Sequence, residues 1–208
     1  MALELKQAIE LLRKESKKRK FAQTIDLIVN LKGIDLKRVN INAVIDIPNK
    51  VKDKKVCGFL TKKSELLPTV TKPEFEKYKE KGKLKSLVNE FDFFIAHASL
   101  MPSVATTFGK ALGPTGKMPS PQLGIITQET SEAINPLLEK ISKSVKIRVK
   151  EASVKVAAGK ESMKDEEIME NVKSIYNGIV NILPKKRENV KEILLKFTMS
   201  KPVKIEIR

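Results

Sequence analysis

Hydrophobic residues follow two different patterns along this chain, one at both ends and another in the middle. At the ends, apolar residues alternate with polar or small ones over residues 25–31, 39–47, 145–149, 154–158, 193–197 and 203–207. Such alternation is typical of strands that bury one face, as strands of antiparallel sheets commonly do. Two distant stretches that share one pattern indicate a single domain assembled from both ends of the chain.

The middle of the chain has the pattern of an α/β region instead. FDFFIAHA (91–98) is a continuous apolar run, as expected of a parallel strand buried on both faces, and KVCGFL (55–60) predicts a shorter strand. Helices are expected between and after these strands, over residues 74–90, 101–112 and 129–142. Strands that alternate with helices are the signature of an α/β fold.

The whole chain is therefore assigned to the α/β (α+β) class, with one domain inserted into another. We predict a discontinuous terminal domain over 1–52 plus 145–208 and an inserted domain over 53–144. The terminal domain should hold two helices, at 3–15 and 164–182. The second begins with Asp165, Glu166 and Glu167, whose carboxylates suit the positive end of a helix dipole.

The net charge narrows the class of partner. The chain has 41 Lys and Arg against 25 Asp and Glu, a net charge of +16. A domain so basic usually binds a polyanion, most commonly nucleic acid. An anionic membrane is the rival partner, but the chain has no Trp and no apolar run long enough to span a bilayer. Segments 1–52, 53–144 and 145–208 carry +6, +4 and +6, so the polyanion is expected on the terminal domain.

Cysteine and histidine content excludes several kinds of chemistry. Cys57 is the single cysteine and His97 the single histidine, which rules out an internal disulfide, a cysteine zinc cluster and a multi-histidine metal site. Cys57 is best interpreted as a core residue and His97 as a residue at a strand end. Acid, base and nucleophile are not found in any recognisable combination. We therefore predict a protein that is not an enzyme, without cofactor or bound metal. The amphipathic N-terminus lacks a signal-peptide stretch, which predicts a cytoplasmic location.

LGPTGKMPSP (112–121) looks like a phosphate-binding loop but does not have the required pattern. A Walker motif needs two glycines five residues apart, then Lys and a hydroxyl residue. Ala111 stands where the first glycine would be, and Met118 stands where the hydroxyl should follow Lys117. The segment also follows an expected helix rather than a strand. Gly113, Gly116 and Lys117 are therefore predicted to form a rigid basic loop, either a secondary RNA contact or an interdomain loop.

Three other segments carry groups suited to RNA or DNA. KKRKFAQT (17–24) sets cations beside an aromatic ring, which could stack on a base or belong to the core. AAGKESM (157–163) is expected to be a turn before a helix, where backbone amides can meet phosphate, or else an ordinary connection. TMSKP (198–202) is expected to be a turn that carries two hydroxyls and a cation. All three lie on the predicted basic terminal domain.

Taken in their order along the sequence, these segments resemble the ribosomal protein L1 family of the large subunit, in its archaeal form. The resemblance covers nearly the whole chain, on the segments KRKFAQTIDLIVNLKGID (18–35), FDFFIAHASLMP (91–102), LGPTGKMPSP (112–121), VAAGKESMKDEEIMENV (156–172) and KFTMSKPVKI (196–205). It implies a terminal sheet-plus-helix sandwich from both chain ends and an inserted Rossmann-like three-layer α/β domain joined by two hinge strands.

The resemblance also implies a function. Members bind the stalk of the large-subunit rRNA beside the tRNA exit site, assist release of deacylated tRNA, and bind their own mRNA leader or coding region to repress translation. The protein would be a monomer within the cytoplasmic ribosome, with no membrane partner. The alternatives are a non-ribosomal RNA-binding regulator and, in another class, an enzyme with a nucleotide in the inserted domain.

Residues carried over from the family define the expected RNA-binding site. They are Lys20, Phe21, Thr24 and Asp26, then Gly159, Lys160, Ser162 and Met163, then Thr198, Met199, Ser200 and Lys201. One departure is Ser200, because family members usually have glycine after Thr-Met. Glycine permits positive φ and close approach of a backbone, whereas serine restricts the turn but adds a hydroxyl.

Overall fold

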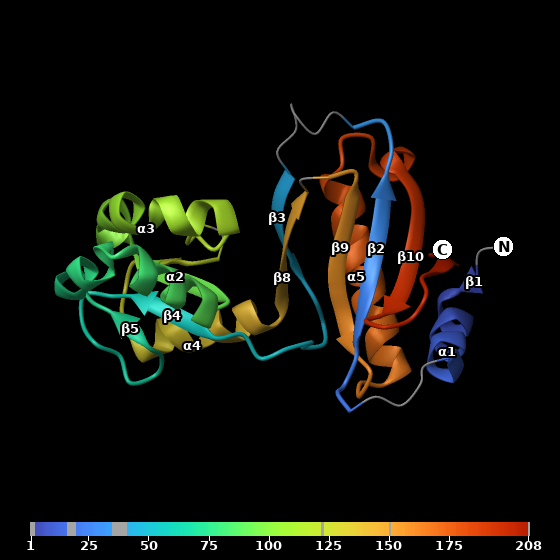
Figure 1. The fold of residues 1–208 in the computed structure, drawn as a ribbon, viewed down its shortest axis with the longest axis horizontal. Coiled ribbons are helices and arrows are strands. Elements are labelled where there is room, and N and C mark those ends of the chain that lie inside the picture. Colours follow the sequence, from blue (N-terminus) through green and yellow to red (C-terminus); the bar gives the residue numbers. More distant parts are fainter. Residues whose placement is uncertain (1–2, 16–19, 35–40, 122, 150, 208) are drawn as a thin grey trace. The chain divides into compact units, whose positions relative to one another are not determined.

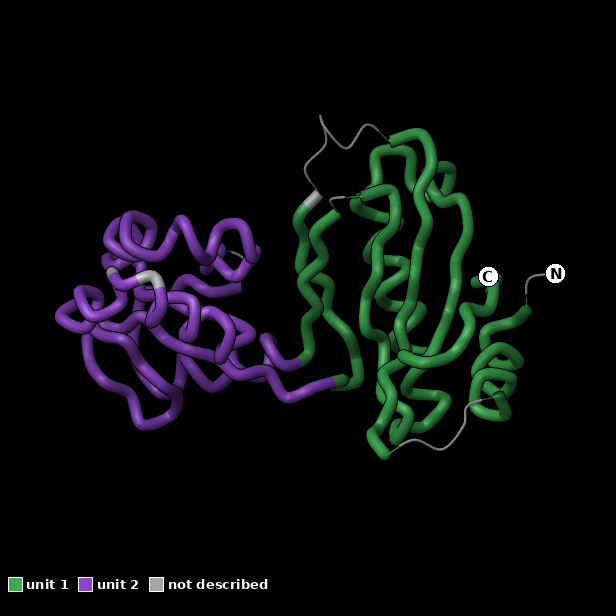
Figure 2. The backbone as a smooth tube through the Cα atoms, in the orientation of Figure 1, with its two compact units in different colours: residues 1–51, 143–208 green, residues 52–142 purple. Residues whose placement is uncertain are grey.

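The computed structural model describes residues 3–15, 20–34, 41–121, 123–149 and 151–207. It divides into two compact units, residues 1–51 with 143–208 and residues 52–142 (Figure 2). We call them the terminal unit and the inserted unit. The mixture of helices and sheets confirms the α/β class.

The terminal unit is built on a five-stranded sheet in the order β1-β11-β10-β2-β9 (Figure 1). β2 lies between two strands from the C-terminal part of the chain, and Leu27 pairs with both Leu195 and Val156. Pairing is antiparallel except between β1 and β11. The strand bounds are Leu3–Glu4 for β1, Thr24–Leu31 for β2, Ser153–Lys160 for β9, Val190–Phe197 for β10 and Val203–Glu206 for β11.

Two helices, α1 (Leu5–Glu15) and α5 (Asp165–Ile182), cover one face of this sheet. A separate antiparallel pair, β3 (Ile41–Asp46) and β8 (Ser144–Val149), shares the same aliphatic core. A Cβ on Gly178 of α5 would lie 2.6 Å from Ile45 of β3, so the close packing of α5 on β3 requires glycine there. The alternation at both chain ends thus corresponds to strands with one face on the core. The opposite face of the large sheet, which holds Asp26, Ile28, Leu194 and Lys196, is partly exposed.

The inserted unit contains a parallel sheet in the order β5-β4-β6-β7. In β6, Phe94 and Ala96 belong to an aromatic cluster with Phe59, Phe75 and Phe108. The alternate residue Ile95 is equally buried, so β6 is buried on both faces, as its continuous apolar run predicts. The strands are β4 (Val56–Phe59), β5 (Thr69–Val70), β6 (Phe93–His97) and β7 (Ile125–Ile126), and the helices are α2 (Lys81–Glu90), α3 (Met101–Thr115) and α4 (Ser131–Ser142).

Two expectations for helices in this unit need correction. The stretch 74–90 is not one helix, because Glu80 is extended, with ψ of 125°, and separates a 3-10 helix (Lys72–Lys79) from α2. Helix α3 continues to Thr115 rather than ending near Leu112. It ends at Gly116, which has φ of 72° and donates to the carbonyl of Gly113 at 3.0 Å. Such a left-handed residue is the usual helix terminator and favours glycine. Gly113 is therefore helical, and the predicted loop begins only at Gly116.

Candidate nucleic-acid interface

The three predicted RNA-facing segments meet at one end of the large sheet. Thr24, which begins β2, pairs with Lys160 at the end of β9, and Ile25 pairs with Phe197 at the end of β10. Residues 20–26, 159–163 and 197–201 therefore lie together where β2 begins and β9 and β10 end (Figure 1). We call this the three-segment surface.

Thr24 and Thr198 join the first and third segments. The hydroxyl Oγ1 of Thr198 accepts from the amide of Thr24 at 3.1 Å and donates to its carbonyl at 3.3 Å. The amide of Thr198 also donates to that carbonyl, at 3.0 Å. The hydroxyl has one donor, which is used, and two acceptor positions, of which one is used. Thr198 thus fixes the turn and keeps one acceptor for an outside donor such as a ribose hydroxyl.

Gln23 connects all three segments and was missed in the sequence. Its side-chain Oε1 accepts from the amide of Met199 at 3.2 Å. Its amide donates to a carboxylate oxygen of Glu161 at 3.1 Å, and its carbonyl accepts from the Glu161 amide at 2.8 Å. Gln23 is 2% exposed. A signal was present, because position 23 has the same parity as the buried residues Ile25 and Leu27, which marks a polar side chain directed into the core.

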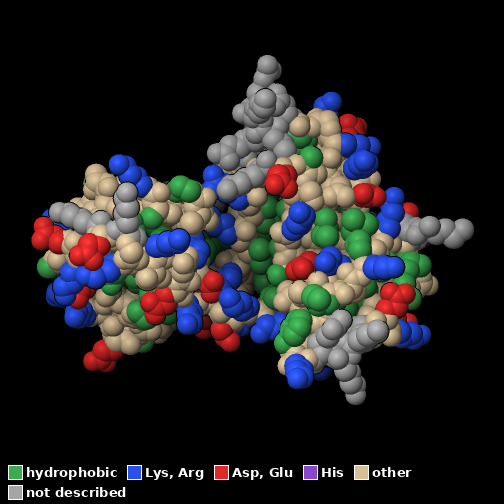
Figure 3. Space-filling view, in the orientation of Figure 1, with side chains coloured by type: hydrophobic (Ala, Val, Ile, Leu, Met, Phe, Trp, Pro, Cys, Tyr) green, Lys and Arg blue, Asp and Glu red, His purple; other side chains and the backbone are tan. Residues whose placement is uncertain are grey.

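Two large apolar side chains project from the three-segment surface. Phe21 is 52% exposed and Met199 is 60% exposed. Only Leu66 joins them as an exposed large hydrophobic among the residues described. The visible face of the terminal unit shows hydrophobic side chains bordered by Lys and Arg (Figure 3). Aromatic and apolar groups set among cations can stack on unpaired bases while the cations meet phosphate.

The second segment is held by Arg13 of α1, another residue that the sequence did not single out. The guanidinium donates to the carboxylate of Asp165 at 2.7 Å and to the carbonyls of Glu161 and Met163 at 2.9 and 2.8 Å. Since a guanidinium is planar and rigid, these bonds fix the loop that links β9 to α5. Ser162 lies on this loop, and Lys160 is the last residue of β9 before it.

The backbone of this second segment does not have the predicted role. Ala157–Lys160 belong to β9, and the amides of Lys160, Glu161 and Met163 all donate within the chain. These three amides are therefore not available to phosphate, which favours the second of the two interpretations, an ordinary connection between strand and helix. Gly159 has a packing reason, because a Cβ there would lie 3.0 Å from Ile168. The side chains, rather than the amides, are left to contact a ligand.

The remaining residues of the predicted site surround this arrangement. Ser200 Oγ accepts from the amide of Phe197 at 2.9 Å, and Ser200 is not among the positive-φ residues, which besides two glycines include only Lys186 of the described chain. The turn therefore accommodates serine. Lys20 and Lys201 are exposed, while the cations at 17–19 fall outside the described residues. Burial raises the pKa of Asp26, against the opposing effect of Lys196 beside it on the open sheet face.

Lys117, predicted to belong to a basic loop, has a structural role in the inserted unit. Its ammonium donates to the carbonyls of Val88 and Phe91 at 2.6 and 2.8 Å, at the C-terminal end of α2. A cation there satisfies free carbonyls and the negative end of the helix dipole. Two of its three donors are thus occupied, so the geometry gives the proposed secondary RNA contact no support.

The carboxyl edge of the parallel sheet in the inserted unit is also occupied by the chain itself. Ligands commonly bind at this edge in open α/β sheets. Here a carboxylate of Glu129 accepts from the amide and hydroxyl of Thr61, both at 2.6 Å, and from the amide of Lys62 at 3.3 Å. Both ring nitrogens of His97 are engaged, with Ser99 at 2.7 Å and the Thr127 carbonyl at 3.0 Å. Thr61, the Lys62 amide and His97 are therefore already bonded within the chain and are not free to bind a nucleotide phosphate.

Other sites suited to chemistry are not found in the described part of the chain. It holds no cluster of three or more His, Cys, Asp or Glu side chains arranged for a metal. Cys57 is buried, and burial raises the pKa of its thiol to about 12, with the charge of Glu90 acting in the same direction. A thiol with so high a pKa is not a nucleophile at neutral pH. Within the same residues, none of the helices could cross a bilayer.

The chain is similar in sequence to a family of known proteins. A model of the ribosomal protein L1p/L10e family matches residues 12–201. The chain is 36% identical to the "Large ribosomal subunit protein uL1" of Methanothermococcus thermolithotrophicus over 210 residues, which cover 96% of each chain. It is 32% identical to the protein of the same name from Pyrococcus abyssi over 211 residues, 96% of this chain and 94% of that one. On this evidence the chain belongs to the ribosomal protein L1p/L10e family.

Proposed function

We propose that the protein is a structural constituent of the large ribosomal subunit in the cytoplasm and that it binds rRNA through its terminal unit. Relatives that match almost the whole chain are named as large ribosomal subunit proteins. The terminal and inserted units correspond in this proposal to the discontinuous RNA-binding domain and the inserted domain of the sequence analysis. The observation that carries the proposal is the three-segment surface, where Gln23 joins stretches of chain up to 176 residues apart.

The proposed recognition depends on the shape of the RNA. RNA helices present 2′-hydroxyls and phosphates across a shallow groove, and unpaired bases can stack on apolar side chains. Thr198 offers a hydroxyl acceptor, Phe21 and Met199 offer apolar contact, and Lys20, Lys160 and Lys201 supply affinity for phosphate. Because Gln23 and Thr198 hold these groups in place before binding, little conformational entropy is lost on association.

Release of deacylated tRNA and repression of the protein's own mRNA are finer proposals that rest on the family resemblance. Both would use the ribosomal position or the same RNA surface. An mRNA that imitates the stalk rRNA would compete for the three-segment surface, so one variant should weaken both interactions equally. Unequal loss would assign the two RNAs to different surfaces.

Substitution of Thr198 tests the rRNA proposal. Thr198→Val removes the hydroxyl that bonds Thr24, and we expect the affinity for a stalk rRNA fragment to fall by roughly 1–3 kcal/mol. Thr198→Ser keeps the hydroxyl and is the matched control, with affinity near wild type. Filter binding at one fixed salt concentration measures both variants. Equal affinity for wild type and Thr198→Val would remove Thr198 from the site.

Two further measurements separate the proposal from its alternatives. Affinity should fall steeply between low and moderate salt, as it does whenever lysines replace counterions on phosphate. The protein should also sediment with large ribosomal subunits, whereas a free RNA-binding regulator would not. A thermal shift caused by ATP or NAD would favour the enzyme class instead, and the position of Glu129 predicts that none occurs.

A further inference from the structure

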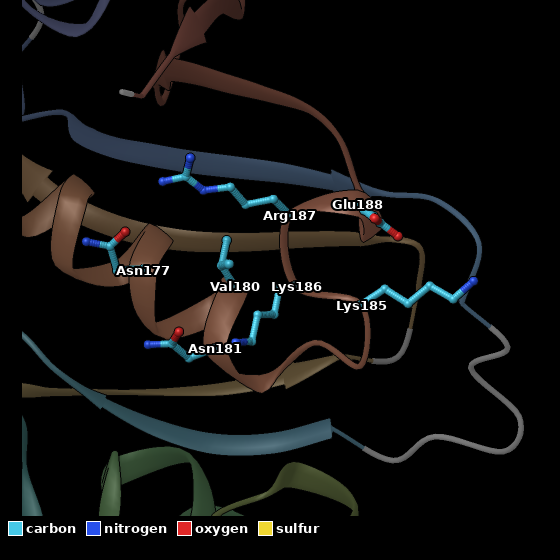
Figure 4. A pocket seen from close by; sticks show the side chains of 7 residues that line it. All are labelled: Asn177, Val180, Asn181, Lys185, Lys186, Arg187 and Glu188. Carbon is cyan, nitrogen blue, oxygen red and sulfur yellow. The ribbon is translucent and has the colours of Figure 1, made fainter.

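A second cationic feature lies at the opposite end of the same sheet. After α5 ends at Ile182, the chain turns through Lys185, Lys186, Arg187 and Glu188 before it enters β10. A cavity of about 650 Å³, open to solvent, lies between the last turns of α5 and this turn (Figure 4). Asn177, Val180 and Asn181 line it from the helix. We call this region the α5-end cleft.

The turn beside the α5-end cleft is firmly held. The buried side chain of Asn189 accepts from the amide of Lys185 at 2.8 Å and donates to the carbonyl of Lys32 at 3.0 Å. The amides of Lys186 and Glu188 donate to the carbonyls of Leu183 and Lys185, both at 3.1 Å. Three amides of the turn are thus bonded within the chain, and they support the charged side chains that the turn carries.

The side chains divide between the cleft and the outside. In Figure 4, Arg187 extends back along the helix on the side of Asn177, and Lys186 runs toward Asn181. Val180 lies between them, whereas Lys185 points away from the helix. Lys186 adopts φ of 49°, a left-handed conformation that is costly for a residue with a Cβ. The cleft therefore has an ammonium and a guanidinium on its walls, two amides, and a small apolar floor.

The positive charge beside the α5-end cleft exceeds what would compensate the dipole of α5. The C-terminal end of a helix carries about half a negative charge, which one nearby cation can compensate. Lys185, Lys186 and Arg187 supply three positive charges against the single negative charge of Glu188. Within the described residues, none of these three cations forms an ion pair. An excess of two charges therefore faces solvent around the cleft.

We propose that the α5-end cleft is a second RNA-binding site, which takes the ribose-phosphate backbone of the same rRNA. This inference rests on the proposed function and extends it. Guanidinium and ammonium groups bind phosphate, and asparagine amides can pair with 2′-hydroxyls. An open cleft suits a polymer that passes through it better than a small molecule, which would be enclosed.

The two sites are too far apart to be one contact. From Thr24 of the three-segment surface to Lys32, which Asn189 secures to the turn, the chain advances by eight residues along β2. At ~3.3 Å per residue this strand separates them by roughly 26 Å. A short RNA that fills the three-segment surface does not reach the cleft, while a longer RNA does. The length of the RNA therefore distinguishes the two sites.

The test uses one triple variant of the full chain and two RNAs. Lys185→Gln, Lys186→Gln and Arg187→Gln remove three charges and keep polar side chains. The matched control, Lys72→Gln, Lys77→Gln and Lys85→Gln, removes the same charge from exposed lysines of the inserted unit. Each protein is titrated with a minimal stalk rRNA fragment and with a fragment extended by one helical segment, and circular dichroism verifies that each is folded.

We expect the cleft variant to bind the extended RNA about tenfold more weakly than the control and to bind the minimal RNA equally well. Its slope of log affinity against log salt on the extended RNA should be smaller by about two, because roughly one counterion is released for each phosphate contact. Equal affinities and slopes of the two variants on the extended RNA would overturn the proposal and assign the cleft to another partner, such as an acidic protein. Failure of the wild type to bind either RNA would instead refute the proposed function.

Discussion

Polar and aromatic groups are placed differently in the terminal unit and in the inserted unit. The inserted unit buries its aromatic rings in one cluster, turns the ammonium of Lys117 onto helix carbonyls, and fills its sheet edge with Glu129. The terminal unit has a mainly aliphatic core, with Tyr176 and Phe197 as its buried aromatic residues, and leaves Phe21 and Met199 on its surface. Exposed apolar side chains are available to a partner, whereas polar groups that are bonded within the chain stabilise the fold. The contrast supports our proposal that the terminal unit binds the RNA.

The largest expected effect is a loss of stability of the inserted unit without a loss of rRNA affinity. Phe108 is fully buried and packs against Phe59 at 4.8 Å and Phe75 at 5.1 Å between ring centroids. Phe108→Ala should destabilise the inserted unit by about 3–5 kcal/mol without weakening rRNA binding below its melting temperature. Phe197→Ala, equally buried but adjacent to Thr198, should lower both stability and affinity. Calorimetry and filter binding measure the two quantities. Loss of affinity in Phe108→Ala would break the contrast between the units.

The next effect concerns the residue that organises the three-segment surface. Gln23→Leu keeps the size of the side chain but removes the acceptor for the Met199 amide. We expect rRNA affinity to fall by roughly 1–3 kcal/mol, because the turn at 198–200 loses its anchor. Gln7→Leu makes the same change at an exposed position of α1 and is the control. If both variants bind as wild type does, Gln23 has no positioning role.

Lys117 provides a sharper comparison of structural and RNA-binding lysines. Lys117→Met removes a cation from the carbonyls of Val88 and Phe91, and we expect the inserted unit to lose about 1–2 kcal/mol of stability. Affinity for rRNA should not change. Lys110→Met, on the exposed side of α3, should change neither quantity. A Lys117→Met protein with normal stability and weakened rRNA binding would restore the secondary contact that the sequence suggested.

The smallest expected effect is a pH dependence of the stability of the inserted unit. Burial raises the pKa of Glu129, but hydrogen bonds from Thr61 and Lys62 outweigh burial and hold that pKa below its ordinary value of 4.5. A carboxylate with a lowered pKa in the folded state adds stability above the unfolded value, and this stability is lost as the pH falls through the folded value. Thermal denaturation between pH 3 and 6 should show that loss in the wild type and in Glu139→Gln. Glu129→Gln should be less stable near neutral pH and should show a smaller loss; part of the loss remains because the pKa of Glu74 in the same unit is also lowered, chiefly by the hydrogen bond from the Thr71 amide.

An element could be predicted from the sequence when its own residues were enough to show a pattern. Strands such as β2 and β10 span eight residues, enough for their period of two to be recognised, and their predictions are confirmed. β5 and β7 have two residues each and carry no period, so they were missed. Helix α3 was predicted too short because glycine and proline at 113–114 looked like a loop, although the last helical turn tolerates both here.

The candidate site was predictable in its segments and not in its connections. Phe21, Thr24, Thr198 and Met199 were singled out from family motifs, and the structure brings them to one end of the sheet. Gln23 and Arg13 were not, because their roles depend on partners more than 130 residues away in the sequence. Neither side chain belongs to a recognisable motif, and their partners come close only when the sheet is assembled. The same holds for Asn189, whose hydrogen bonds secure a turn and give no motif.

The order of segments along the chain also imposes an order on synthesis. Every contact within the inserted unit lies between residues 52 and 142, so that unit can fold once its last residue has left the ribosome. The sheet of the terminal unit cannot close until β10 and β11 are available, because Thr24 pairs with Thr198, 174 residues later. A nascent chain therefore has no three-segment surface until residues 197–201 have been synthesised and can pair with β2.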